Sequence, residues 1–432
     1  MKRKLKRHIG LIILIAIALV FPTSLNYQAR LNMRIIVTGI AIDKTDDNYQ
    51  VTAQVVKTSP GNESPGTNAE IAFITDQAKT LSEAVSRLAY KAGKVSAFSH
   101  TNFVIVGNSL LNEDVTLCLD YFIRDKIIKN SALIVFSEKS AEEEIKKTKE
   151  TELSVGIGLQ KVFLFKENEG DGLMTTIIDF LNQNKMYSGS AVASLMSLKT
   201  NDEYKQQKSQ SGSSNSGQSL ESQQSQTQQQ GGSTSGSSSS QGGSGDASQS
   251  SQDSKQYFEP DAPLMCFVNG KYVGKIEDEF EVKGYMLANP ETSKNEIYLE
   301  NIDIGRLYNT KIEVAIKNKK CTQKVVYKNG KPTLEITVNI HKSELAEIMT
   351  SEVVAGLTKQ EYDAIINATK EAVKGKITKC FETAKGFGCD VFNAYENAFK
   401  FKYNETVKYN TPQDFLKELN VEVKVNIYQL DY

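Results

Sequence analysis

The chain has 432 residues, which is enough for two or three domains of ordinary size. Its charge is almost balanced, with 51 Lys and Arg against 52 Asp and Glu, but five of the positive charges lie within positions 2–7. The remaining 46 basic and 52 acidic side chains leave the rest of the chain acidic, so electrostatics do not favour binding to nucleic acid.

The first 25 residues have the pattern of an export signal. A basic stretch from Lys2 to His8 precedes the apolar run Ile9–Phe21. The positive end should stay in the cytoplasm while the rest of the chain crosses the membrane. Pro22-Thr23-Ser24 fits a cleavage site poorly, so we predict an uncleaved membrane anchor, with a removed signal peptide as the alternative. Because no cysteine precedes Cys118, the sequence has no lipid-attachment motif.

The first folded region should begin with a hairpin. The apolar run in residues 34–43 is one strand, and the alternation of apolar and polar residues over 49–55 is the other. Asp43, Asp46, Asp47 and Asn48 lie between them. Their spacing does not match an EF-hand, so we interpret this cluster as a solvated turn rather than a calcium site.

Strands and helices then alternate as far as a third helix that begins after Ser140, which predicts an α/β layer. Thr80-Leu-Ser-Glu83 and the pair Ser140 and Glu143 have the spacing of helix-capping boxes, and Gly93 should end the first helix. The expected strands are 70–75, 103–106 and 132–136, and the expected helices begin at about residues 81, 110 and 141.

We find no catalytic constellation in the sequence. His100 is the most suggestive residue, but neither a Gly-x-Ser-x-Gly elbow nor a His-Glu-x-x-His helix accompanies it, and His341 is distant in sequence. We interpret His100 as a structural histidine at the start of a strand. Asp120 and Arg124 should form an ion pair on a helix surface.

The five cysteines do not predict a zinc site or a dense disulfide framework, because no pair has Cys-x-x-Cys spacing. Cys380 and Cys389 could pair in an oxidising compartment, although buried free thiols are the simpler interpretation. The sequence therefore predicts no catalytic residues, no metal ligands and no cofactor.

Residues 206–254 consist almost entirely of Ser, Gln and Gly, which bury too little apolar surface to offset chain entropy, so we predict disorder. Strand-like segments flank this tract at 190–196 and 263–268, and Asn269-Gly270 then predicts a hairpin to 271–274. We expect the flanking segments to share one small sheet that the tract interrupts. A plain interdomain linker is the alternative.

The carboxy-terminal region should place a long helix across an antiparallel sheet. Strand signals occur at 297–299, 311–316, 324–327 and 333–340, and Asn329-Gly330 should join the last two as a hairpin. Thr358-Lys-Gln-Glu361 is a clear capping box, and the helix after it has apolar residues at helical spacing as far as Ala384. Alternation over 421–427 predicts a final strand.

Together these patterns predict a mixed α/β (α+β) protein of several domains, with small mixed sheets packed with helices. The expected organisation is an anchor at 1–25, an amino-terminal α/β domain at 28–185, a middle domain at 186–305 interrupted by 206–254, and a carboxy-terminal α/β domain at 306–432.

Several motifs, taken in order, resemble the Ger(x)C family, the C subunits of spore germinant receptors. They are Gly39-Ile-Ala-Ile-Asp43, Ser99-His100 before Val104-Ile-Val-Gly107, Leu119 to Asp125, Cys266 to Gly274, Gly284-Tyr-Met-Leu287, and Lys385 to Phe392 with Asp390. The order and spacing of the motifs, rather than any one of them, carry the resemblance, which covers nearly the whole chain outside the tract.

The resemblance implies a three-domain mixed α/β protein on the outer face of the membrane around the spore core. The implied partners are a polytopic A subunit and a transporter-like B subunit, and no catalysis is implied. Members of the family are usually lipid-anchored through a cysteine that this chain lacks. We therefore predict a non-enzymatic, membrane-associated, extracytoplasmic subunit of a nutrient germinant receptor that acts through protein contacts. An extracytoplasmic solute-binding protein or a structural envelope protein is the alternative.

Overall fold

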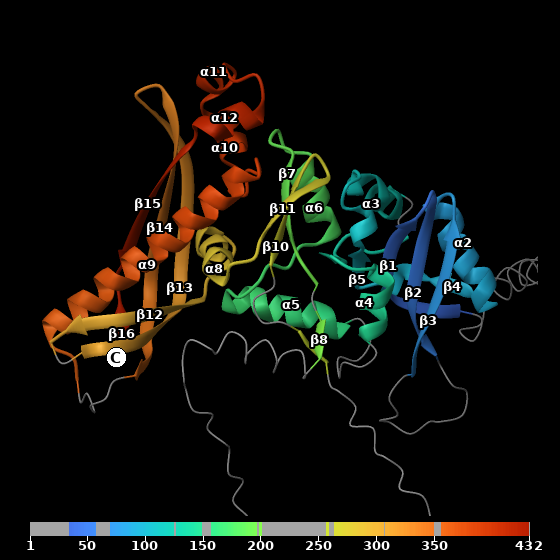
Figure 1. Ribbon diagram of the computed structural model, residues 1–432, viewed down its shortest axis with the longest axis horizontal. Coiled ribbons are helices and arrows are strands. Elements are labelled where there is room, and N and C mark those ends of the chain that lie inside the picture. The colour runs from blue at the N-terminus through green and yellow to red at the C-terminus, as the bar shows by residue number, and fades with distance from the viewer. Residues whose placement is uncertain are drawn as a thin grey trace, which may run out of the picture.

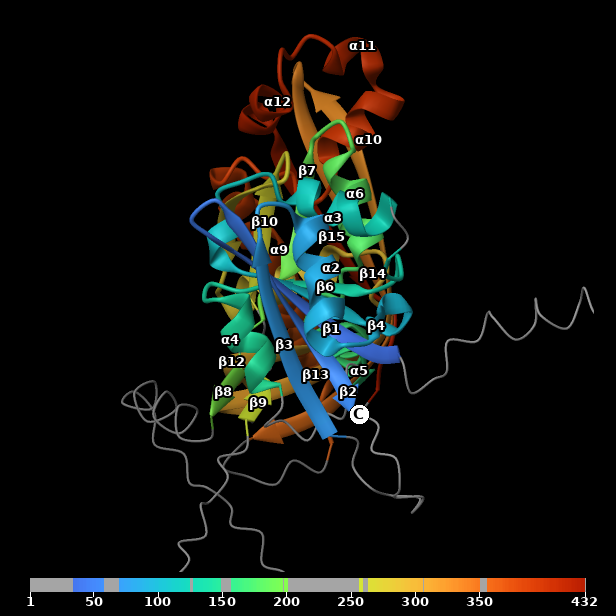
Figure 2. The same ribbon diagram turned by 90° about the vertical axis from the view of Figure 1, so that its right-hand side faces the viewer.

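Three sheets lie one after another along the long axis of the molecule, with helices packed between and against them (Figures 1 and 2). The computed structural model describes residues 34–57, 70–124, 127–148, 157–196, 198–200, 256–258, 263–305, 307–349 and 356–431. The mixed α/β fold class predicted from the sequence is confirmed. The expected anchor at 1–25 and the tract at 206–254 lie outside the described residues, and the expected domain boundaries stay predictions.

The first sheet begins with the expected hairpin of β1 (Arg34–Thr45) and β2 (Asn48–Lys57), and β3 (Glu70–Ala78) continues it antiparallel. β4 (Val95–Ala97), β5 (Phe103–Val106) and β6 (Leu133–Phe136) add to it in parallel. Gly39 lets β1 pass under the ring of Phe103, because a Cβ at this position would lie 2.1 Å from the ring carbon Cζ.

Helices cover both faces of this sheet. α2 (Leu81–Ala92) begins at Thr80, whose side chain accepts a hydrogen bond from the Glu83 amide, and ends at Gly93 in the left-handed conformation, as expected. α3 (Val115–Arg124) begins five residues later than expected. Residues 108–110 form a 3-10 turn instead, and Asp114 then accepts the Thr116 amide, so the α-helix begins after Asp114.

The predicted capping of α4 (Ala141–Lys147) by the pair Ser140 and Glu143 is wrong, because the Ser140 side chain makes no capping hydrogen bond. The carboxylate of Asp43, at the end of β1, caps this helix instead. It accepts the Ala141 amide at 2.9 Å, the Glu142 amide at 2.8 Å and the Ser140 hydroxyl at 2.9 Å. Asp43 is therefore buried and does not belong to the solvated turn that its neighbours form.

The middle sheet contains β7 (Ser190–Ser194), β10 (Leu264–Val268) and β11 (Lys271–Ile276). β7 pairs antiparallel with β10 from Ser190 opposite Val268 to Ser194 opposite Leu264. The segments that flank the tract thus share one sheet, which confirms that expectation. The tight turn at Asn269-Gly270 has positive φ at both residues, as the hairpin prediction requires.

A two-stranded ribbon leads into and out of the tract. Its strands are β8 (Leu198–Thr200) and β9 (Gln256–Phe258), with Thr200 opposite Gln256. The helices around the middle sheet are α5 (Ile157–Glu169), α6 (Ile177–Asn184) and α8 (Glu279–Ala288). Figure 1 shows α5 along the lower side of this region and α8 beside the third sheet.

The third sheet is antiparallel across β12 (Asn295–Ile304), β13 (Leu307–Lys328) and β14 (Lys331–Met349). The segments expected as separate strands at 311–316 and 324–327 belong to the single strand β13. Pairing with β14 continues through the polar residues between these segments, with irregular register near Asn318. The strand buries Lys319 there, and its ammonium donates to the Asn289 and Thr292 carbonyls and the Thr292 hydroxyl.

β15 (Asn420–Ile427) and β16 (Leu430–Asp431) run parallel to β14, so the sheet is mixed rather than wholly antiparallel as expected. The reason is the connection, since α9 (Lys359–Gly386) crosses the sheet between β14 and β15 and returns the chain to the same edge. The capping box of Thr358 and Glu361 at the start of α9 is confirmed. The remaining helices are α10 (Ala394–Phe401), α11 (Tyr403–Thr406) and α12 (Pro412–Glu418).

Replacing residues 206–254 by about eight Gly/Ser residues should preserve the fold. β8 and β9 already hold the two ends of the connection side by side, and the shorter loop lowers the closure entropy by about 1 kcal/mol. Cleavage within the tract should likewise leave the two parts associated, because β7 and β10 still pair. Size-exclusion chromatography of the nicked chain is the measurement, and separation into two folded parts would contradict the shared sheet.

Asp43→Ala should lower the free energy of unfolding by about 2–4 kcal/mol, because it leaves two helix amides without their buried charged acceptor. Ser140→Ala is the matched control and should cost about 0.5–1.5 kcal/mol, since only one hydrogen bond to Asp43 is lost. Denaturant titration of both variants measures the difference. A larger loss of stability for Ser140→Ala than for Asp43→Ala would show instead that Ser140 caps the helix.

Candidate functional site

The turn that follows α9 joins the middle sheet to the carboxy-terminal helices. Gly388 takes a left-handed conformation with φ of 71°, which turns the chain back toward β7. The Asp390 amide then donates to the Ser190 hydroxyl at 3.0 Å. The two carboxylate oxygens of Asp390 accept the Ala394 amide at 2.9 Å and the Tyr395 amide at 2.7 Å, so Asp390 caps α10. One buried residue thus connects a strand of the middle sheet with the first turn of α10.

The carboxylate of Asp390 is buried in an environment that opposes its charge. Burial raises the pKa of Asp390 to about 6, even though the two amide donors act in the opposite direction. The cap therefore changes its charge within a mildly acidic pH range. Protonation removes one acceptor oxygen from the first turn of α10. The contact of Asp390 with β7 and α10, which we call the Asp390 joint, therefore depends on pH.

Two thiols meet at the same joint. Cys389 lies against β7 and β10 and its thiol approaches the Phe267 carbonyl at 3.5 Å. A hydrogen bond with Cys266, together with burial, holds the pKa of Cys389 well above its usual range. All five cysteines are buried and free, which confirms the interpretation as buried thiols. Cys389 therefore neighbours Cys266 across the joint, rather than pairing with Cys380 as the alternative would require.

Two glycines allow the elements at this joint to approach closely. A Cβ on Gly274 of β11 would lie 2.6 Å from the Phe387 ring, and a Cβ on Gly284 of α8 would lie 2.1 Å from the Lys376 carbonyl oxygen of α9. Both glycines belong to motifs that the sequence analysis singled out. Gly274 lets the Phe387 ring after α9 pack against the middle sheet, and Gly284 lets α8 pack closely against α9.

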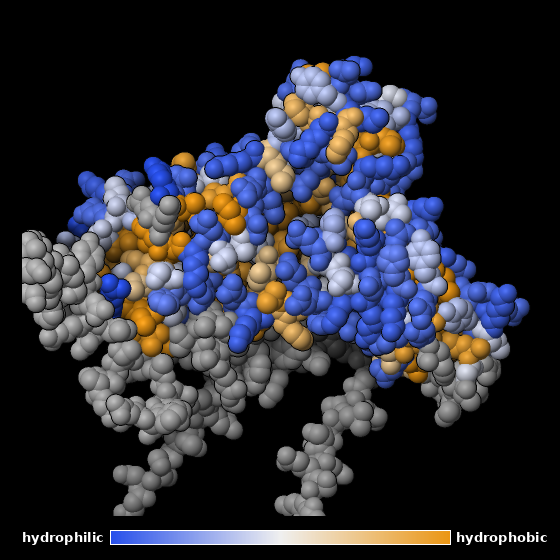
Figure 3. Space-filling view, turned by 180° about the vertical axis from the view of Figure 1, so that it is seen from behind, coloured by the Kyte–Doolittle hydropathy of each residue, from blue (hydrophilic) through white to orange (hydrophobic). Residues whose placement is uncertain are grey.

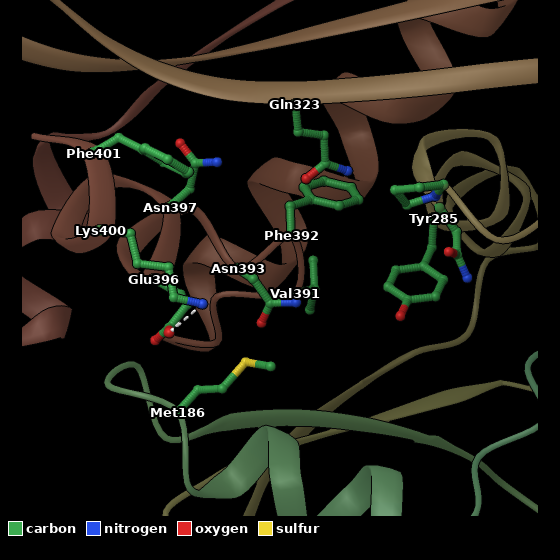
Figure 4. Close-up of a pocket in the computed structure, with 12 residues that line it drawn as sticks. Met186, Tyr285, Gln323, Val391, Phe392, Asn393, Glu396, Asn397, Lys400 and Phe401 are labelled. Carbon is green, nitrogen blue, oxygen red and sulfur yellow. Dashed lines mark ion pairs between the residues drawn. The ribbon is translucent and has the colours of Figure 1, made fainter.

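A hollow of about 420 Å³ lies beside this joint, between α10, the end of α8 and the loop that precedes β7 (Figure 4). Its volume falls within the range of small-molecule sites. The residues that line it are Met186, Tyr285, Asn289, Pro290, Gln323, Val391, Phe392, Asn393, Glu396, Asn397, Lys400 and Phe401. The walls combine apolar side chains with carboxamides and a single ion pair.

The polar groups of the hollow fall into two kinds. Some hold the walls in place: Gln323 donates to the Ala288 carbonyl at 2.8 Å, and Asn397 accepts the Val325 amide at 3.0 Å. The Tyr285 hydroxyl, in contrast, points into the hollow (Figure 4), and Tyr285 makes no side-chain hydrogen bond with any residue the structure describes, although only 8% of the residue is exposed. Burial holds the pKa of Tyr285 well above its usual range, so this hydroxyl stays a donor.

An ion pair forms the left wall of the hollow in Figure 4. Lys400 donates to Glu396 at 3.0 Å, and the other oxygen of Glu396 accepts the Tyr187 amide at 3.1 Å. Glu396 therefore ties α10 to the loop that enters the middle sheet. The sequence analysis missed Tyr187, Glu396 and Lys400. The i, i+4 spacing of Glu396 and Lys400 on a short helix was the available signal for their ion pair.

The residues that the sequence analysis weighed for chemistry lie apart from one another. His100 is exposed at the end of a 3-10 turn, and His341 stacks on Tyr428 with ring centroids 5.4 Å apart. Asp120 and Arg124 form the expected ion pair on the surface of α3. Among the described residues, no group of three His, Cys, Asp or Glu could hold a metal ion, and no helix is long and apolar enough to span a membrane.

Comparison with known proteins assigns both halves of the chain to related models. The family model described as "Spore germination protein N-terminal domain" matches residues 27–198, and "Spore germination B3/GerAC like, C-terminal" matches residues 264–429. The interval between the two matches contains the Ser/Gln/Gly tract.

Among curated proteins, the chain is similar to spore germination protein B3 of Bacillus subtilis (strain 168), with 30% identity over 105 residues. Spore germination protein KC of the same organism is 27% identical over 121 residues. These alignments span 24% and 26% of this chain, and only 28% and 29% of the relatives. The crystal structure of the GerBC protein resembles the fold with a TM-score of 0.50 at 15% identity, and the superposition covers 90% of this chain and 97% of that one.

Asp390→Asn should abolish one component of the pH dependence of stability. A carboxyl whose pKa is raised by folding contributes stability that is fully present below its unfolded pKa of about 4 and is lost as the pH rises through about 6. When the pH falls from 7 to 4, the free energy of unfolding of the parent chain should therefore rise by about 2–3 kcal/mol relative to that of the variant. Denaturant titrations at matched pH measure this difference, and a constant difference would show that Asp390 does not titrate in this range.

Proposed function

Because the chain belongs to the Ger(x)C family of spore germination proteins, we propose that it is the C subunit of a nutrient germinant receptor. In this role it is a non-enzymatic subunit held at the outer face of the membrane around the spore core, with residues 1–25 as its anchor. Its partners are a polytopic A subunit and a transporter-like B subunit. It acts in germination through protein contacts.

The observation that carries this proposal is where the family-like motifs lie. Asp43, Gly274, Gly284 and Asp390 all occupy places where two elements meet, and none belongs to a catalytic cluster. These residues hold neighbouring helices and strands in fixed positions relative to one another. A protein built in this way can transmit a displacement from one surface to another. That is the task of a subunit that works by contact.

Transmission through this subunit would follow the Asp390 joint. α10 is attached to β7 through Asp390 and Ser190, and to the preceding loop through Glu396 and the Tyr187 amide. Movement of the carboxy-terminal helices relative to the middle sheet must disturb one of these bonds. A partner that contacts α10 would therefore bias the joint directly.

A solute-binding role is the second candidate, and the hollow favours it. The Tyr285 hydroxyl, which has no hydrogen-bond partner among the residues that the structure describes, is aimed into a space large enough for a small polar molecule. In that case the hollow, rather than a protein surface, would receive the signal.

Deleting the gene should slow or abolish the germination of spores in response to at least one nutrient, measured as the fall in optical density after nutrient addition. A tagged chain should also co-purify with two polytopic proteins from detergent-solubilised spore membranes. Normal germination with every nutrient, together with altered envelope permeability, would instead support a structural envelope protein.

Complementation with Tyr285→Phe separates the two candidates, because this variant removes only the hydroxyl that faces the hollow. A contact-acting subunit should germinate like the parent with this variant. Loss of the nutrient response with unchanged co-purification and unchanged thermal unfolding would favour the solute-binding role.

A further inference from the structure

Large apolar side chains are exposed on the protruding lobe that α10 and α11 form (Figure 1). Phe401 is 73% exposed, Tyr403 is 53% exposed and Val407 is 51% exposed, and Tyr187 beside them is 59% exposed. Figure 3 shows apolar side chains among polar ones on this protruding lobe. We call these four residues the aromatic tip.

The aromatic tip is held in an ordered arrangement. The Tyr187 and Phe399 rings lie with their centroids 4.1 Å apart, and the Phe399 and Tyr403 rings meet edge to face at 5.1 Å. The backbone of Tyr187 is fixed by the Glu396 carboxylate. The Tyr187 and Tyr403 rings are therefore ordered by their contacts with Phe399 before any partner binds, which lowers the entropy lost on binding.

Lysines surround the aromatic tip. Residues 399–403 read Phe-Lys-Phe-Lys-Tyr, so apolar and basic side chains alternate there, and Lys408 follows Val407. Lys185, Lys402 and Lys408 are exposed and form no ion pair in the part of the chain that the structure describes. Glu405 is the acidic residue within this stretch, and Glu396 is already occupied by Lys400 and the Tyr187 amide. The tip therefore carries a local positive charge on a body that is otherwise acidic.

A lipid surface explains this combination better than a protein partner does. Aromatic side chains favour the headgroup level of a bilayer, and each lysine near an anionic leaflet contributes about 1 kcal/mol. Long lysine side chains can place their charges among headgroups while apolar neighbours enter the acyl boundary. The tip also protrudes, whereas the anchors of protein interfaces are usually enclosed by a rim that excludes water.

We propose that the aromatic tip docks onto the surface of a bilayer that contains anionic lipids. Phe401 and Val407 enter the acyl boundary, and Lys402 and Lys408 meet lipid phosphates. The contact is separate from the anchor expected at 1–25, because α10 and α11 protrude on the carboxy-terminal side of the middle sheet, whereas β1, where the described chain begins, lies on the other side of that sheet (Figure 1). It goes beyond the proposed function, since two attachments would fix the orientation of the molecule on the membrane.

The chain contains no tryptophan, so a single introduced tryptophan reports on one place only. The experiment uses the full chain carrying Phe401→Trp, incorporated into vesicles of phosphatidylcholine alone or of phosphatidylcholine with 30% phosphatidylglycerol. In the anionic vesicles the emission should shift to shorter wavelength, and lipids brominated on the acyl chain should quench it. In the neutral vesicles both effects should be weaker.

The matched control is Tyr90→Trp, because Tyr90 is 84% exposed on α2 in the first region of the fold and lies away from the tip. Its emission should be the same in both vesicles and should not be quenched. Adding Lys402→Gln and Lys408→Gln to the Phe401→Trp chain should reduce the ratio of docked to undocked protein about 30-fold, which corresponds to the loss of two lysine contacts.

The proposal is overturned if the Phe401→Trp emission is the same in both vesicles and brominated lipid does not quench it. The exposed apolar side chains of the tip would then be assigned to contact with a protein. Equal quenching of the Tyr90→Trp control would also overturn it, because that result indicates adsorption without a specific face.

Discussion

The structure depends on the middle sheet, whose strands β7 and β10 are buried on both faces. Met265 and Phe267 of β10 pack into the core of the first region, while Leu264 and Cys266 pack into the core of the carboxy-terminal region. Since successive side chains of a strand point to opposite faces, one short strand contributes to two cores. Neither the first nor the last region can shift relative to this sheet without exposing apolar surface.

The contacts on the two faces differ in kind. On the side of the first region, the rings of Phe136, Phe180 and Phe267 form a triad with centroids 4.4–5.3 Å apart. On the other side, Leu264 and Cys266 also pack against apolar side chains, and polar contacts of Cys389 and Asp390 with β10 and β7 are added to this packing. Apolar ring packing resists changes of pH, whereas a buried carboxylate responds to them. Both faces are therefore held by apolar packing, and the face toward α10 carries in addition a buried carboxylate that responds to pH.

Two surface features of the molecule share one helix. The hollow and the aromatic tip both lie on α10, and Phe401 belongs to both. A contact at the tip is therefore one helix away from the joint at Asp390, which caps the start of the same helix. A displacement of α10 at the tip would therefore also displace its capped first turn, because the helix has only 8 residues.

The sequence by itself determined the local elements, because their signals are contained within a few residues. The capping box at Thr358, the hairpin at Asn269-Gly270 and the helical spacing of the α9 face all needed only neighbouring positions. The pairing of β7 with β10 also followed, since both are short apolar segments beside the tract. Family-like motifs were visible in order, although their physical roles were not.

Tertiary structure decided everything that joins distant residues. Asp43 caps a helix almost one hundred positions later, and this bond displaced the local cap expected at Ser140. β15 became parallel because α9 carries the chain back across the sheet, and β13 stayed continuous because β14 pairs with its polar centre. The hollow arises from four segments, and the loop at Tyr187 has no local pattern that predicts it. Local propensity specifies that a helix or strand forms. Only the packing of the whole chain decides which distant side chain caps that helix and which strand pairs with that strand.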